Sequence, residues 1–160
     1  MSWASVRRLS GWIVLVSERD SSVVVLGGGP GGYEAALVAA QLGATVTIVD
    51  RDGLGGAAVL TDCVPSKTLI STSDSLSRFD RAVEQGVMTE GSRPGHEAAT
   101  NLAAVNERIL GLAAAQSQDI EARLNTVGAR VCRGMGRLVS ATRVSVKLAD
   151  GTTEELPADV

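Results

Sequence analysis

A short apolar run that leads directly into a glycine cluster constrains the fold more than any other feature of this chain. Residues 23–26 read Val-Val-Val-Leu, and Gly27, Gly29 and Gly32 follow at the spacing Gly-x-Gly-x-x-Gly. An alanine-rich segment with helical periodicity comes next, and a second β-branched run ends at Asp50. A strand, a glycine turn, a helix and a second strand in this order predict a βαβ unit that binds a dinucleotide.

Each glycine of this spacing has a physical role. The first turns the chain tightly, the second lets the backbone approach a pyrophosphate, and the third lets the helix pack on the strand. Unpaired N–H groups at the helix start would hold the phosphate charge, and Pro30 falls near the first turn, where its missing N–H costs little. The alternative is a glycine-rich turn with no ligand, against which the surrounding strand, helix and acid argue.

The acid at the end of the second strand would complete such a site. Asp50 would accept hydrogen bonds from a ribose 2′-hydroxyl, and its charge would repel a 2′-phosphate. Arg51 weakens that exclusion, so it is kept among the candidate cofactor-binding residues, although we favour a solvated charge after the strand.

Composition restricts the class of protein. The 160 residues are enough for one ordinary core, and a net charge of −3 gives no reason to expect a nucleic acid or an anionic membrane as a partner. The two cysteines lie far apart in the sequence and form no disulfide framework, which indicates a reducing, cytoplasmic location. The apolar run at residues 12–16 is too short for a signal peptide or a membrane span. We therefore interpret residues 1–21 as an extension, either disordered or forming an added edge strand.

The rest of the chain predicts an α/β fold: a Rossmann-like, three-layer nucleotide-binding domain over residues 22–160, with a parallel sheet, a small antiparallel β-meander and an incomplete set of strands. Ser66 is expected to cap a helix carrying Leu69, Leu76 and Phe79 near one face, because Pro65 disfavours a helical Val64. The other expected elements are strands at 22–27, 45–50 and 129–133, helices at 31–42 and 101–127, one or two helical turns at 57–62, a loop at 85–96, a meander at 136–156, and a further strand starting at Ala158.

Several motifs in order resemble one family. GGGPGGYEAALVAAQLGATVTIVD, GLGGAAVLTDCVPSK, the long helix and RGMGRLVS are similar to the FAD-binding start of the pyridine nucleotide–disulfide oxidoreductases, which include dihydrolipoamide dehydrogenase. The nearest likeness is to actinobacterial flavoproteins regarded as NAD(P)H:quinone reductases, which share GGAAVL, DCVPSK and LAAAQS. The resemblance covers roughly residues 22–160.

This resemblance implies a set of cofactor contacts. FAD would lie with its pyrophosphate on residues 27–32 and its adenosine ribose on Asp50. Lys67 ends the motif Cys-x-Pro-Ser-Lys and would lie near the reactive nitrogen of the flavin, where a cation favours the negative charge of the reduced ring. A solvated helix lysine is the alternative for Lys67. The remaining contacts implied, all made by backbone, are those of Gly55, Gly56, Ala57 and Gly136.

The departures from the family pattern bear on function. The disulfide reductases of this family carry two redox cysteines five residues apart, whereas this chain has Cys63 at the second place and Ala58 at the first. One thiol cannot form the intramolecular disulfide, so dithiol–disulfide exchange of the usual sort is excluded. Cys63 would then either form a charge-transfer contact with FAD or be a buried, inert thiol retained by packing, and we favour the inert interpretation slightly.

Length is the second departure, because family members also carry an NAD(P)H domain and a C-terminal dimerisation domain. His96, the one histidine, matches nothing catalytic, and we interpret it as a surface residue. The leading hypothesis is a flavoprotein oxidoreductase fragment whose family passes electrons from NAD(P)H through FAD to a quinone-like acceptor. The alternatives are a truncated, non-catalytic fragment that binds FAD or ADP, a compact NAD-binding oxidoreductase domain, and a dihydrolipoamide dehydrogenase, which Ala58 disfavours.

Overall fold

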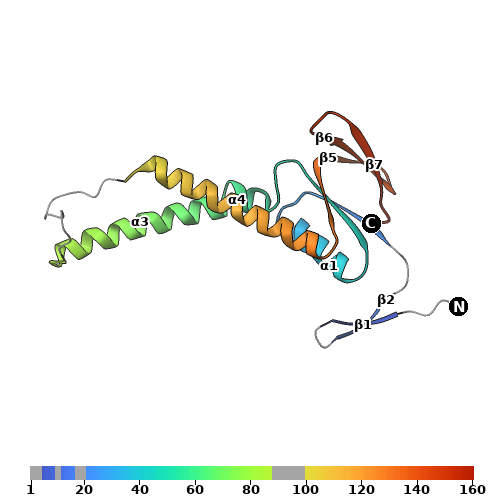
Figure 1. Ribbon diagram of the computed structural model, residues 1–160, viewed down its shortest axis with the longest axis horizontal. Coiled ribbons are helices and arrows are strands. Elements are labelled where there is room, and N and C mark those ends of the chain that lie inside the picture. Colours follow the sequence, from blue (N-terminus) through green and yellow to red (C-terminus); the bar gives the residue numbers. More distant parts are fainter. Residues whose placement is uncertain (1–4, 10–11, 17–20, 88–99) are drawn as a thin grey trace. The chain divides into compact units, whose positions relative to one another are not determined.

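The computed structural model describes residues 5–9, 12–16, 21–87 and 100–160 (Figure 1). The chain divides into two compact units, one made of residues 1–56 and 117–160 and the other of residues 57–116. The predicted dinucleotide motif lies wholly in the first unit.

The first unit contains a five-stranded mixed sheet. Its order along the sheet is that of the sequence: β3 (Ser22–Leu26), β4 (Thr45–Asp50), β5 (Arg130–Ser140), β6 (Arg143–Leu148) and β7 (Thr153–Pro157). The β3–β4 and β4–β5 pairs are parallel, whereas β5–β6 and β6–β7 are antiparallel. The sheet confirms the predicted combination of parallel strands with an antiparallel meander.

One strand is longer than predicted. We expected a strand at 129–133 and a separate meander from 136, but β5 runs without interruption from Arg130 to Ser140. Its first residues pair with β4 up to Arg133, and the pairing with β6 begins at the next residue, Gly134. Because one ladder takes over where the other stops, the backbone hydrogen bonds of β5 continue and the strand does not end.

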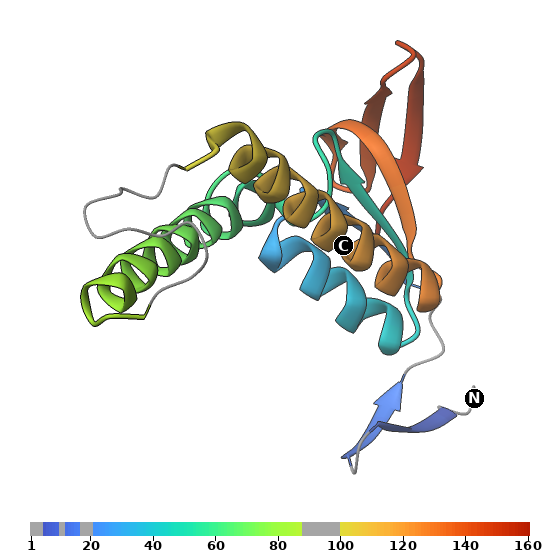
Figure 2. The same ribbon diagram turned by 60° about the vertical axis from the view of Figure 1, so that its left-hand side comes forward.

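Helix α1 (Pro30–Gln41) packs against β3 and β4, as Figure 2 shows. Ile48 and Val49, consecutive residues of β4, are both buried. Since successive side chains of a strand point to opposite faces, both faces of β4 are covered. Val49 belongs to a core cluster with residues of β5, β6, β7 and the segment after β7, namely Cys132, Val144, Val146, Leu156 and Ala158.

The last described residues extend this sheet beyond its assigned strands. The amide of Val24 donates to the carbonyl of Val160 (3.1 Å), and the amide of Asp159 donates to the carbonyl of Ser22 (2.8 Å). The chain after β7 therefore runs along the free edge of β3, which agrees with the strand start expected at Ala158.

The N-terminal residues form a sheet of their own. β1 (Ser5–Leu9) and β2 (Trp12–Val16) pair antiparallel with each other and belong to a separate two-stranded sheet. We expected a disordered extension or an added edge strand, whereas residues 5–9 and 12–16 pair with each other. Only Ser10 and Gly11 separate the two strands in the sequence, and a two-residue connection with glycine favours a local hairpin over long-range pairing.

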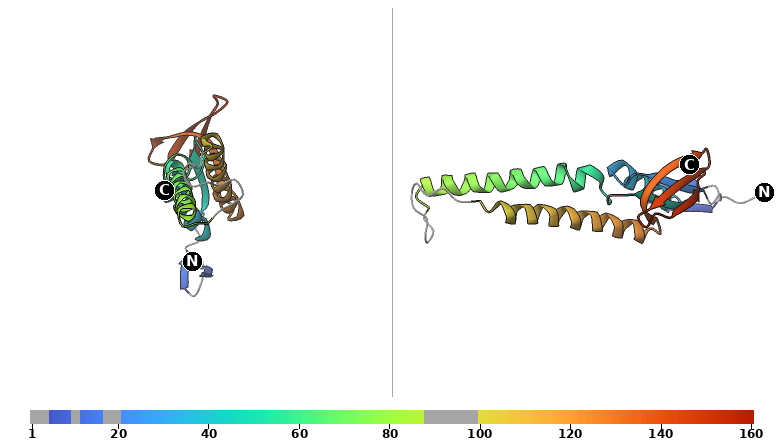
Figure 3. Two further views of the ribbon diagram at one scale, coloured as in Figure 1. Left: turned by 90° about the vertical axis from the view of Figure 1, so that its left-hand side faces the viewer. Right: turned by 90° about the horizontal axis from the view of Figure 1, so that it is seen from above.

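The second unit contains three helices or parts of them. These are α2 (Gly56–Leu60) except for its first residue, α3 (Cys63–Glu84), and the first part of α4 (Leu102–Thr126). Figure 3 shows α3 and the start of α4 running antiparallel side by side. The cap predicted at Ser66 is wrong, because α3 already begins at Cys63. Pro65 is tolerated there because its missing N–H falls in the first turn, where amides have no partner one turn back. The first bond runs from the Ser66 amide to the Asp62 carbonyl (2.8 Å).

The other helix boundaries agree with the sequence. The Asn101 side chain caps α4 by accepting the Ala104 amide (3.1 Å), and Gly128 follows the helix end with its amide on the Asn125 carbonyl. The expected loop after α3 begins at its end, but residues 88–99, which include His96, lie outside the described residues.

An ion pair on the sheet gives the first prediction. Arg130 and Glu154 form a bidentate pair with two N–O distances of 2.7 Å, and the hydrogen bond from Arg130 lowers the pKa of the Glu154 carboxyl. A lowered folded-state pKa stabilises the protein above the unfolded-state pKa, about 4.3 for Glu, and this stabilisation is lost as the pH falls through the folded-state value. Wild type should therefore lose more stability between about pH 5 and pH 3 than Glu154→Gln, measured by urea unfolding.

If the ion pair causes this pH dependence of stability, removing either partner should reduce it. Arg130→Met and the double variant Arg130→Met/Glu154→Gln should show the same reduced pH dependence as Glu154→Gln. A double variant that kept the wild-type acid sensitivity would contradict the assignment.

Candidate dinucleotide site

The glycine loop connects β3 to α1. The amide of Gly27 still donates to the Val49 carbonyl (2.8 Å), as in the β3–β4 ladder, and Gly27 then takes a φ of +100°. This left-handed conformation turns the chain sharply and favours glycine. Gly29 is the N-cap of α1, and Pro30 is its first helical residue. The loop therefore has the strand, turn and helix start that the fingerprint predicts.

The helix start presents free amides at the surface. The first bond of α1 runs from the Tyr33 amide to the Gly29 carbonyl (3.0 Å), so the amides of Gly31 and Gly32 precede the helical ladder. Apart from Gly29 and its two chain neighbours, no atom of the described residues lies within 4 Å of the point where a Cβ of Gly29 would stand. Free amides, the positive end of the helix dipole and open space beside Gly29 suit a phosphate group.

Gly32 has the packing role expected of the third glycine. A Cβ at this position would overlap the carbonyl oxygen of Gly27 and come within 3.4 Å of Val25 Cγ1. The first turn of α1 can approach the end of β3 this closely only because the side chain is absent.

Asp50 ends β4 and faces the glycine loop. Its Oδ2 accepts the Gly28 amide at 2.7 Å, and its Oδ1 accepts the amides of Asp52 and Gly53 at 2.8 Å each. The sequence places the acid at the strand end but does not reveal these backbone contacts. The structure thus brings Asp50 to the loop with part of its hydrogen-bonding capacity already used.

Leu54 is a residue of this site that the sequence analysis missed, as is the buried contact that it makes beside Gly28 of the loop. Gly28 is buried, and its carbonyl accepts the amide of Gly55 at 2.7 Å. Leu54 is fully buried, and a Cβ on Gly28 would lie 2.7 Å from its Cδ2. The signal in the sequence is the unbroken run of residues 27–29, three glycines where the fingerprint requires only two.

Three further glycines of this unit were predicted to contact the cofactor. Gly55 and Gly56 lie beside the glycine loop, whereas Gly136 lies on β5. Gly56 comes so close to Gly29 that a Cβ would stand 2.9 Å from the Gly29 Cα, and Gly55 bonds to Gly28 as described. A Cβ on Gly136 would overlap Leu26 Cδ2. Packing against Leu26 is therefore a reason for glycine at 136 that needs no ligand.

Arg51 is engaged by its neighbour at the surface. Its Nε and Nη2 donate to the two carboxylate oxygens of Asp52, both at 2.8 Å. This hydrogen bonding, followed by the attraction of the opposite charges, raises the pKa of Arg51, and the same hydrogen bonding lowers that of Asp52. Both side chains of this pair are exposed. This is compatible with our interpretation of Arg51 as a solvated charge after the strand.

The remaining candidates belong to the second unit. Ala57 and Lys67 are exposed, Lys67 on α3. Cys63 begins α3 and is exposed, so our interpretation of it as a buried thiol is wrong. The helix starts two residues before Pro65, which leaves Cys63 in an exposed first turn. The buried cysteine is Cys132 of β5, where burial raises the pKa of the thiol.

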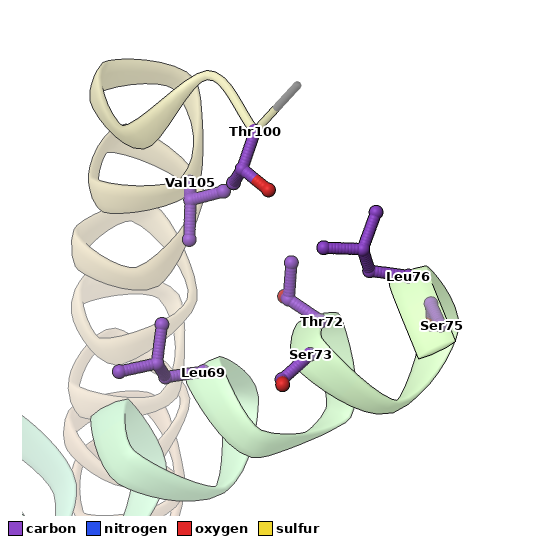
Figure 4. Close-up of a pocket in the computed structure, with 7 residues that line it drawn as sticks. All are labelled: Leu69, Thr72, Ser73, Ser75, Leu76, Thr100 and Val105. Atoms are coloured by element: carbon purple, nitrogen blue, oxygen red, sulfur yellow. The ribbon is translucent and has the colours of Figure 1, made fainter. Parts of the chain in front are cut away.

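The second unit also contains an open, mainly apolar hollow of about 390 Å³ between α3 and the start of α4 (Figure 4). Leu69 and Leu76 of α3 face Val105 of α4 across it, and hydroxyl-bearing residues complete the lining. None of the predicted cofactor residues lines this hollow, so it is distinct from the glycine-loop site.

A glycine loop between parallel strands, with a carboxylate at the end of the second strand, is the arrangement typical of an α/β dinucleotide-binding domain. The pyridine nucleotide-disulphide oxidoreductase family matches residues 21–160. The chain therefore belongs to this family, and the resemblance inferred from the motifs is confirmed.

Individual relatives agree with this assignment. An NAD(P)H dehydrogenase (quinone) of Mycobacterium tuberculosis is 44% identical over 147 residues, which covers 86% of this chain and 29% of the relative. Dihydrolipoyl dehydrogenase 2 of Haloarcula marismortui is 33% identical over 126 residues, covering 79% of this chain and 25% of the relative. The crystal structure of LpdA from M. tuberculosis superposes with a TM-score of 0.77 at 43% identity, covering 88% of this chain and 30% of that one.

The chain thus spans less than a third of the length of these relatives. Members of the family are FAD-dependent oxidoreductases that use NAD(P)H, and they typically form homodimers. None of the helices in the described part of the chain has the length and apolar character needed to cross a membrane.

Proposed function

We propose that the first unit binds the ADP half of FAD. The amides of Gly31 and Gly32 at the start of α1 would hold the pyrophosphate, with Gly29 leaving room for its approach, and Asp50 would accept a hydrogen bond from the adenosine ribose. The observation that carries this proposal is the combination of open space beside Gly29 with the free helix start and the carboxylate of β4. An uncharged turn without amides directed outward would not suit a dianion.

We further propose that the chain takes part in electron transfer from NAD(P)H through FAD to a quinone-like acceptor. When bound, FAD would supply two-electron redox chemistry. The support comes from the M. tuberculosis relative named as a quinone dehydrogenase and from Ala58, which leaves Cys63 without a partner five residues away. Dithiol chemistry needs two sulfur atoms, so a dihydrolipoyl dehydrogenase reaction is disfavoured although relatives carry that name.

The residues of the second unit keep supporting roles in this proposal. Lys67, by its place in the family motif, would supply a positive charge beside the flavin ring, and Cys63 would be a neighbouring thiol. The first unit would bind and orient the nucleotide.

Calorimetric titration of the purified chain with ADP and with FAD tests the binding step. Both should bind, and ADP should compete with FAD because both need the same phosphate loop. NADP⁺ should not bind at this site, because its 2′-phosphate would meet the negative charge of Asp50. A well-folded chain, verified by circular dichroism, that took up neither ADP nor FAD would overturn the proposal.

A further inference from the structure

The three hydrogen bonds of Asp50 involve no ligand. The carboxylate joins the glycine loop, through the Gly28 amide, to the segment after β4, through the amides of Asp52 and Gly53. A carboxylate offers about four acceptor positions, so three are already used within the protein. One position, on Oδ2, is left for a ribose hydroxyl.

Gly28 is held on both of its peptide groups. Its amide donates to Asp50 Oδ2 and its carbonyl accepts the Gly55 amide, each at 2.7 Å. A Cβ would stand 3.1 Å from Oδ2 and from Cβ of Asp50, in addition to its approach to Leu54. A side chain at residue 28 would therefore crowd both the carboxylate and Leu54, and glycine avoids this.

These two bonds fix the direction of the neighbouring groups. The C=O and N–H of a trans peptide point in opposite directions. The bond from the Gly28 amide to Asp50 thus directs the Gly27 carbonyl away from Asp50, and this carbonyl lies against Gly32 at the helix start. The bond from Gly55 to the Gly28 carbonyl likewise directs the Gly29 amide away from residues 53–55.

We infer that Asp50 is a positioning residue that fixes the Gly28 peptide, and with it the orientation of the phosphate loop, before any nucleotide arrives. The identity of the ligand in this inference rests on the proposed function. The hydrogen bonds of Asp50 within the protein do not depend on it. In this arrangement Asp50 acts on the pyrophosphate site through the backbone, in addition to its proposed contact with the ribose. Preformed amides cost no ordering when the anion binds.

The first test uses the ligand-free chain of 160 residues. Amide hydrogen exchange measured by NMR should show the Gly28, Asp52 and Gly53 amides protected in wild type. In Asp50→Asn the single side-chain oxygen should stay with the amides two and three residues ahead, so the Gly28 amide should exchange at least tenfold faster. A carboxamide has only one acceptor oxygen, so it cannot serve both sides of the contact. Asp119→Asn is the matched control, because Asp119 pairs with Arg123 on the surface of α4, and it should leave these amides protected. Unprotected amides in wild type, or equal protection of the Gly28 amide in Asp50→Asn, would overturn the inference.

A measurement on wild type alone covers the case in which Asp50→Asn does not fold. A scalar coupling across the hydrogen bond, from the Gly28 amide nitrogen to the Asp50 carboxylate carbon, should be detectable without nucleotide. Its absence, together with rapid exchange of the Gly28 amide, would also overturn the inference.

The second test separates the backbone role from the ribose contact. ADP and 2′,3′-dideoxy-ADP, which lacks both ribose hydroxyls, are titrated into wild type, Asp50→Asn and Asp119→Asn. If Asp50 orients the loop, Asp50→Asn should weaken binding of the dideoxy nucleotide about tenfold as well. Unchanged affinity for the dideoxy nucleotide would show that Asp50 acts only through the ribose and would refute the inference.

Failure of the proposed function would look different. A wild-type chain that bound no adenine nucleotide would refute the proposed function, whereas the exchange and coupling measurements, made without ligand, would still decide the role of Asp50.

Discussion

Replacing Gly32 with alanine should destabilise the whole first unit and abolish nucleotide binding. The new Cβ would overlap the Gly27 carbonyl oxygen, which is backbone and cannot rotate away. Either α1 must shift away from β3 or the turn at Gly27 must open. Overpacking of this kind typically costs roughly 1–3 kcal/mol. Because the Cβ overlaps a backbone atom, which cannot move aside as a side chain can, we expect a loss of stability at or above the upper end of this range. Urea unfolding of wild type and variant measures the loss, which is large against a total of roughly 5–15 kcal/mol for a typical domain.

Gly31→Ala is the matched control for this variant. Gly31 is the next residue toward the N-terminus and also lies in the first turn of α1. Apart from its chain neighbours and the backbone of its own helix, no described atom lies within 4 Å of its Cβ position. Alanine there should be neutral or stabilise the protein by up to about 1 kcal/mol, because it favours the helix over the unfolded chain. Equal stability of Gly32→Ala and Gly31→Ala would contradict the packing role of Gly32.

The sequence predicted the parts of this fold that depend on local periodicity and spacing. The strands at 22–26 and 45–50 and the helices α1 and α4 follow from apolar patterns and glycine positions within one short window each. The Asn101 cap is equally local, since an asparagine accepts an amide three residues ahead.

The features that the sequence did not predict depend on residues distant in the chain. β5 continues past Arg133 because β6, formed later in the chain, supplies the next ladder. The contact between Gly28 and Asp50 joins residues 22 positions apart, and no pattern in either segment specifies which amide the carboxylate accepts. The start of α3 at Cys63 is a different case, because the preference against a helical residue before proline is weak enough to be overridden in a first turn.

The site shows the same division between local and distant information. The positions of Gly27, Gly29 and Gly32 were predictable because each role is set by its place in the turn. Whether Asp50 is free to meet a ribose depends on the segment of residues 52–55 folding back over the loop, which only the three-dimensional structure shows.

Replacing Gly29 with valine should leave the fold intact and remove nucleotide binding. Gly29 has φ −66° and ψ 178°, an extended conformation that any residue adopts and that β-branched residues favour. Apart from its two chain neighbours, no described atom lies within 4 Å of its Cβ position, so the added side chain would start in open space beside the helix start. A pyrophosphate held at about 2.9 Å by amides cannot share that space, and the loss of two charge-assisted hydrogen bonds at roughly 1.5–3 kcal/mol each corresponds to at least ~100-fold weaker binding.

The comparison that decides this prediction is between stability and affinity in the same variant. Gly29→Val should unfold in urea within about 0.5 kcal/mol of wild type, while its affinity for ADP and FAD in calorimetric titrations falls. Gly111→Ala, an equally unobstructed glycine on α4 outside the glycine loop, should retain full affinity. A Gly29→Val chain that bound ADP as tightly as wild type would show that the phosphates do not lie at this turn. Gly32→Ala cannot provide that evidence, because it disturbs the fold and the site together, whereas Gly29→Val changes only the space that the ligand needs.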